Sequence, residues 1–162
     1  MHSAPIKRTR GGDYRVHLSA DERDLLRRQT GELEHLLAAD SQNPSLRRLR
    51  PRAYEDDDHG EREFRSLMGA ELDANRLDNL RALADTADRE RLTADELERW
   101  LAALNDLRLV LGTRLDVKED TFATGFDPQA PGAYELAVYA FLTWLQEAAV
   151  AASGSGRRCG RE

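Results

Sequence analysis

Leucine most constrains the fold of this chain, because it is abundant and regularly spaced. The 162 residues include 24 Leu but only five Val and one Ile. Side chains that branch at Cβ favour strands, so their scarcity argues against an extended sheet. The leucines recur at intervals of three and four residues, which places them on one side of an α-helix. The pattern therefore predicts an all-α protein.

Four segments carry this helical spacing. They are residues 19–40, 61–85, 93–115 and 131–152. Ser19 with Glu22, and Thr93 with Glu96, predict capping boxes at two of the helix starts. The fourth segment is apolar nearly all round, so we expect it to be the most buried helix. Together the segments predict a single domain resembling a four-helix bundle.

The remaining parts of the chain are predicted to form an arm, a connection and a tail. Tyr14, Val16 and Leu18 alternate with polar residues, and Gly11–Gly12 supplies a turn, so residues 1–18 predict a short β-hairpin arm. Residues 41–60 form a charged connection, and residues 153–162 have the composition of a flexible tail. We therefore expect one helical domain over residues 1–152.

The charge distribution limits the classes of partner. Residues 1–52 carry 11 Lys and Arg against 7 Asp and Glu, whereas residues 53–162 carry 13 against 23. The resulting balances are +4 and −10, and an acidic body argues against direct binding of nucleic acid. One cysteine allows no disulfide within the chain. Without an apolar signal at the N-terminus, and with charges in the most apolar segment, we expect a cytoplasmic protein that does not span the membrane.

The sequence offers few residues for catalysis. Its four histidines are scattered, and no two of them stand four residues apart as helical metal ligands do. It contains neither a nucleophile elbow nor a glycine-rich phosphate loop. We therefore expect no catalytic residue, no metal and no cofactor, and a function other than that of an enzyme.

The stretch "LNDLRLVLGTRL", residues 104–115, combines a leucine stripe with polar residues. The residues beside the leucines are Asn105, Asp106, Arg108, Gly112 and Arg114. One interpretation is a structural polar seam, whose side chains bond to neighbouring helices and set one packing arrangement. The other is a working site that uses Asp106 and Arg108. Because Gly costs about 1 kcal/mol relative to Ala inside a helix, Gly112 predicts that a backbone or bulky ring passes close by.

Two further features are candidates for contacts with partners. The first is a run of four arginines: Arg47, Arg48, Arg50 and Arg52. These cations could contact an acidic partner, or they could neutralise the acidic residues that follow. The second is Cys159, a weak redox candidate because nearby arginines favour its thiolate. Without a second cysteine, it could form only an intermolecular disulfide or a mixed adduct.

Several of these stretches resemble one known family. "LNDLRLVLGTRL" preceded by Trp100, "NPSLRRLRPRAYEDD" at 43–57, "YAFLTWLQEAAV" at 139–150 and the start "IKRTRGGDYRVHLSADERDLL" are similar to the actinobacterial domain of unknown function 2017 family. That family is described as one of oxidative stress transcriptional regulators. The resemblance implies a small cytoplasmic regulator without enzyme activity, which contacts a sigma factor and so RNA polymerase. It also implies redox sensing by cysteine pairs, whereas this sequence has Cys159 alone.

Two interpretations of function follow. The first is a transcription-linked protein that acts by protein–protein contact in the oxidative stress response. The alternative is a helical adaptor or scaffold unrelated to transcription, for instance in protein turnover or sulfur metabolism, because an acidic helical domain without a base-reading element suits either role. Association into a homo-oligomer is compatible with both.

Overall fold

The computed structural model describes residues 3–40, 42–49, 58–117, 121, 125 and 127–154. Its helices are α1 (Ala20–Ala39), α2 (Asp58–Thr86), α3 (Ala94–Leu115) and α4 (Ala133–Gly154). A 3-10 turn, η1 (Pro44–Leu46), and three strands, β1 (Ile6–Arg8), β2 (Tyr14–Val16) and β3 (Arg91–Leu92), accompany them. The predicted helical class and N-terminal hairpin are confirmed.

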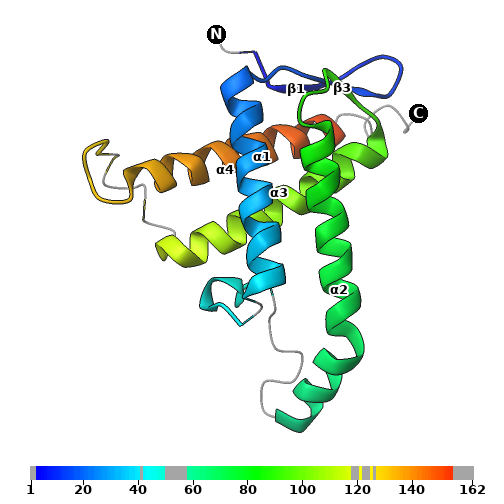
Figure 1. Cartoon of the computed structure of the whole chain (residues 1–162). Helices are drawn as coiled ribbons and strands as arrows, with labels where there is room; N and C mark the ends of the chain where they lie inside the picture. Colours follow the sequence, from blue (N-terminus) through cyan, green and yellow to red (C-terminus); the bar gives the residue numbers. More distant parts are fainter. Residues whose placement is uncertain are drawn as a thin grey trace.

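The helices form two pairs that cross each other. α1 and α2 lie side by side, and they cross the pair formed by α3 and α4 (Figure 1). α3 contacts each of the other helices and η1. It contributes a long row of buried residues: Leu97, Trp100, Ala103, Leu104, Leu107, Val110, Leu111 and Gly112. The segment with the strongest leucine stripe is therefore the centre of the core.

The prediction that the fourth helix is the most buried is wrong. α4 buries five residues, Val138, Leu142, Leu145, Ala149 and Ala152, and packs mainly on α3 and β1. Of its most apolar 18 residues, 28% are buried. Apolar composition did not predict burial, because α4 keeps large apolar residues such as Trp144 and Val150 exposed. By length and composition it could also cross a membrane, although core helices of soluble proteins often meet the same criteria.

A three-stranded antiparallel sheet covers one end of the helices. In the predicted hairpin Ile6 pairs with Val16 and Arg8 with Tyr14, and Gly12 adopts a φ of 91° in the turn. A third strand, β3, pairs Leu92 with Tyr14 and was not predicted, because two residues show no alternation. The apolar residues of the sheet are buried, so it belongs to the core of the helical domain.

The helix ends follow the sequence signals only in part. Thr93 and Glu96 form the predicted capping box, with bonds of 3.2 and 2.8 Å. Ser19 accepts the Glu22 N–H at 3.2 Å, but Glu22 Oε2 is buried without a hydrogen-bond partner in the described part of the chain. α4 begins two residues after Pro131, because Gly132 has a φ of 78°, outside the helical range.

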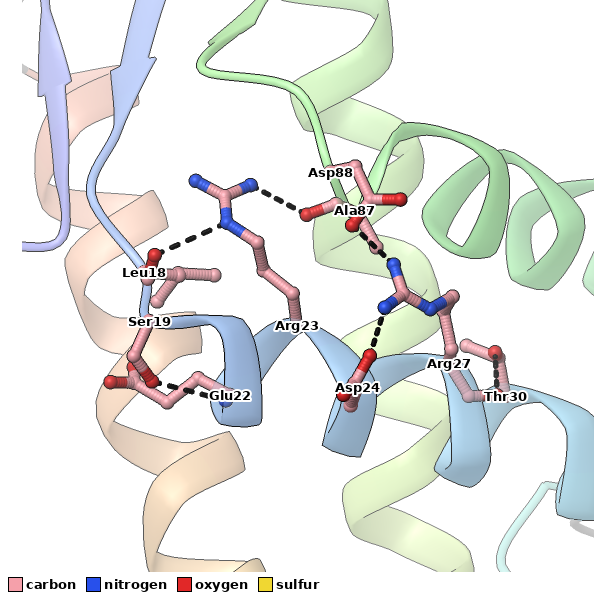
Figure 2. Close-up of polar contacts among 9 residues, drawn as sticks. All are labelled: Leu18, Ser19, Glu22, Arg23, Asp24, Arg27, Thr30, Ala87 and Asp88. Carbon is pink, nitrogen blue, oxygen red and sulfur yellow. Dashed lines mark hydrogen bonds and ion pairs between the residues drawn. The ribbon is translucent and has the colours of Figure 1, made fainter.

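Polar contacts of two arginines tie α1 to the turn between α2 and β3 (Figure 2). Arg23 donates to the carbonyl oxygens of Leu18, Ala87 and Arg89 at 3.1, 2.6 and 2.9 Å. One turn further along α1, Arg27 pairs with Asp24 and Asp88. The bonds of Arg23 satisfy backbone carbonyls that lie outside the helices and strands, and the pair of Arg27 with Asp88 adds a second link between α1 and the turn.

Candidate functional site

The polar residues of "LNDLRLVLGTRL" point toward different neighbours of α3. Asp106 faces α2, Arg108 faces α4, and Gly112 is buried beside η1 and α4. Asn105 and Arg114 are exposed. Asp106 and Arg108 therefore do not converge on one reacting centre. The arrangement links α3 to three other elements.

Asp106 lies opposite Arg76, a residue of α2 that the sequence analysis did not single out. Arg76 Nε is 3.9 Å from Asp106 Oδ2, and the two side chains are 19% and 14% exposed. Arg76 also pairs with Asp73 at 3.3 Å and donates to the carbonyl oxygen of Leu49. It thereby connects α2, α3 and the segment after η1.

The environment of Asp106 disfavours its charge. Burial raises the pKa of Asp106 to about 6 from an ordinary value of 3.8, although the positive charge of Arg76 acts in the opposite direction. A separation of 3.9 Å leaves this attraction too weak to offset the loss of hydration. Asp106 is thus a partly buried carboxyl group that ionises near neutral pH.

Arg108 fastens α4 to α3. Its Nε donates to Thr143 Oγ1 at 3.0 Å, and its Nη1 donates to Gln146 Oε1 at 2.5 Å. The guanidinium also lies 5.5 Å from the centre of the Tyr139 ring, within the range of a cation–π contact. The residues that receive Arg108 stand three and four apart on α4, so they lie on one side of it.

Gly112 lies where α3 meets α4 and the segment after η1. A Cβ atom built there would lie 3.2 Å from Arg48 Nη1 and 3.2 Å from Tyr139 Cε2. The close approach of a ring that the sequence predicted at Gly112 is therefore present. It places the guanidinium of Arg48 beside the α3–α4 contact, next to the ring that also receives Arg108.

The arginine segment is anchored by its apolar neighbours. Leu46 and Leu49 are buried in the core, and Asn43 caps η1 by accepting the Ser45 N–H at 2.9 Å. Arg47 and Arg48 are consequently held at the surface, where both are exposed. Arg50, Arg52 and Cys159 lie outside the described residues. We refer to Arg47 and Arg48 as the arginine surface.

A separate hollow of about 240 Å³ opens between α1, α3 and α4. Its lining combines cations, carboxylates and apolar residues: Arg28, Gln29, Glu32, Leu111, Arg114, Tyr134, Glu135 and Val138. Among these described lining residues there is no nucleophile paired with a base. Within the described ranges, no group of three or more His, Cys, Asp or Glu side chains could hold a metal ion.

Sequence reasoning found the residues on α3 but missed their partners. Arg76 did leave a signal, because it stands four residues from both Leu72 and Leu80 and so interrupts an apolar helical stripe. Tyr139, Thr143 and Gln146 left none, since polar residues on a helix usually face water. Which helix they meet is a property of the tertiary structure.

The fold and this set of contacts define a small helical domain whose central helix is joined to its neighbours by polar side chains. The chain belongs to the family described as domain of unknown function DUF2017, whose model matches residues 3–153. The family resemblance found in the sequence is thus confirmed.

Among curated proteins, the chain is similar to the "Oxidative stress regulator AosR" of Mycobacterium bovis and of two strains of Mycobacterium tuberculosis. Each is 33% identical over 126 residues, covering 65% of this chain and 56% of the relative. The chain therefore spans little more than half the length of these relatives. No solved structure matches it significantly.

Proposed function

We propose that this protein is a non-enzymatic regulator of the oxidative stress response that acts on transcription by binding another protein. The observation that carries the proposal is its 33% identity to proteins named as oxidative stress regulators, within a shared family. A sigma factor or another component of RNA polymerase is the partner to test first. The cytoplasm is the compartment in which such a partner would be met.

The arginine surface is the proposed contact with that partner. Arg47 and Arg48 are exposed, yet the residues on either side of them are anchored in the core. Cations presented on a rigid support bind acidic protein surfaces without losing much conformational entropy on binding. The acidic balance of residues 53–162 disfavours DNA as the partner, because phosphates would be repelled.

Affinity capture followed by mass spectrometry tests this proposal, with cells grown with and without oxidant. Arg47→Glu/Arg48→Glu should lose the transcription component, whereas wild type retains it. The matched control is Arg15→Glu/Arg99→Glu, because both residues are exposed and the change in charge is the same. The proposal is refuted if wild type recovers no transcription component. Capture of proteins of turnover or sulfur metabolism would instead favour the adaptor role.

The redox input can be tested in the same experiment. Cys159 is the one cysteine of the sequence, so a thiol response must use it through an intermolecular disulfide or a mixed adduct. Cys159→Ser should then abolish any dependence of capture on oxidant while leaving basal capture intact. A variant that still responds to oxidant would show that the signal enters elsewhere.

A further inference from the structure

The outer face of the three-stranded sheet carries a row of three cations. Lys7 of β1 lies opposite Arg15 of β2, and Arg15 lies opposite Arg91 of β3. Residues opposite each other in neighbouring strands are on the same side of the sheet, and all three are exposed. Because neighbouring strands are about 4.8 Å apart, the row is about 10 Å long. We call it the cationic row.

This register is unfavourable for the sheet by itself. Like charges directly opposite each other in adjacent strands destabilise a sheet, and here two such pairs share Arg15. The side chains of Lys7 and Arg15 make no hydrogen bond or ion pair with the residues that the structure describes, whereas Arg91 pairs with Asp13 at 3.2 Å. Asp13 neutralises at most one of the three charges. An anion bound across the row would relieve the remaining repulsion.

The fold concentrates positive charge around the cationic row. Residues 5–17 and 90–92, which form the sheet and the turn of its hairpin, hold five Lys and Arg against two Asp and Glu. Two of these cations, Arg8 and Arg10, are exposed in addition to the row. The acidic balance of residues 53–162 lowers the affinity for phosphates, but charges more than about 8 Å away are largely screened at physiological salt. The surface around the row is therefore locally positive.

We propose that the cationic row binds the phosphate backbone of nucleic acid. Double-stranded DNA carries one negative charge per about 1.7 Å of its axis, whereas an extended acidic peptide places one side chain toward the sheet per about 6.8 Å. Three closely spaced cations therefore gain more from phosphates than from the carboxylates of a peptide. The row consists of cations alone and has no aromatic residue to stack on bases, so the contact is independent of sequence.

The cationic row and the arginine surface are separate. The hairpin precedes the start of α1 at Ala20, and η1 follows the end of α1 at Ala39, so they lie at opposite ends of this helix (Figure 1). A helix of 20 residues is about 30 Å long. Arg15→Glu should accordingly leave capture through the arginine surface unchanged. Binding of nucleic acid does not rest on the regulatory role proposed above, and either proposal can fail without the other.

Fluorescence anisotropy tests the proposal, with the full chain titrated into a labelled mixed-sequence DNA duplex of about 20 base pairs. Three phosphate contacts predict that raising the salt from about 50 mM to 200 mM weakens binding about 40-fold. Lys7→Gln/Arg15→Gln removes two of the contacts, so the same change in salt should weaken binding only about threefold to fourfold. A second duplex of different sequence should bind equally well.

The matched control is Arg47→Gln/Arg48→Gln, which removes two exposed cations of the arginine surface. It should keep the affinity and the salt dependence of wild type. The proposal is overturned if wild type does not bind the duplex at about 50 mM salt, or if the control rather than Lys7→Gln/Arg15→Gln loses binding. Tighter binding of polyglutamate than of the duplex would assign the row to an acidic protein and would also overturn it.

Thermal unfolding separates binding from a structural role of the cationic row. Lys7→Gln/Arg15→Gln removes the like-charged pairs of the sheet, so its thermal midpoint should equal or exceed that of wild type. A lower midpoint would show that these cations stabilise the fold and would overturn the argument for a bound anion.

Discussion

Asp106→Asn should stabilise this protein at neutral pH, although the residue belongs to the polar seam of α3. The pKa of Asp106 is raised to about 6 from 3.8 in the folded state, so folding disfavours its charged form. Between these values the folded state binds more protons than the unfolded state, and its stability therefore falls as pH rises. The penalty is about 2 kcal/mol at pH 5 and about 3 kcal/mol at pH 8. Asparagine has nearly the same shape and avoids it.

The assay is urea unfolding followed by tryptophan fluorescence at pH 5 and pH 8, because Trp100 is fully buried. The stability difference between Asp106→Asn and wild type should be positive and should grow by about 1 kcal/mol between the two pH values. Asn105→Ala, on the exposed side of α3, should stay within about 0.5 kcal/mol of wild type at both. A variant less stable than wild type at pH 8 would refute the reasoning and show that the pair with Arg76 is net stabilising.

Three further changes test the contacts around α3 and α1. Gly112→Ala should destabilise the protein by about 1 kcal/mol, although Ala has a better helix propensity than Gly, because the added Cβ would lie 3.2 Å from the Tyr139 ring. Urea unfolding measures this change, and a variant more stable than wild type would contradict it. Trp100→Phe loses the 2.7 Å bond from Nε1 to Thr86 Oγ1 and should lower the thermal midpoint, at a cost of about 1–3 kcal/mol. Arg23→Lys should lower the free energy of unfolding by about 1.5–3 kcal/mol, because a lysine side chain cannot reach the same carbonyl oxygens. Urea unfolding measures this loss, and an unchanged midpoint would show that these bonds do not stabilise the protein.

The helices of this protein could be predicted because their signals are local. Leucine spacing and the Thr93–Glu96 box relate residues three or four positions apart, and both survive in the structure. The two-residue strand Arg91–Leu92 could not be predicted, because it becomes a strand only by pairing with Tyr14 and Arg15. The start of α4 was misplaced for a related reason, since the conformation of Gly132 is not evident from its neighbours.

The sequence by itself determined that this chain is helical, that its third helix carries a leucine stripe, and that Gly112 needs a close neighbour. Each conclusion follows from a residue that suits or violates the preferences of its own helix. Only the tertiary structure decided that Arg76 meets Asp106, that Tyr139 is the ring at Gly112, and that α4 keeps an apolar side exposed. Those outcomes depend on how many neighbours surround each helix, which is set by contacts between residues distant in the chain rather than by the spacing within one segment.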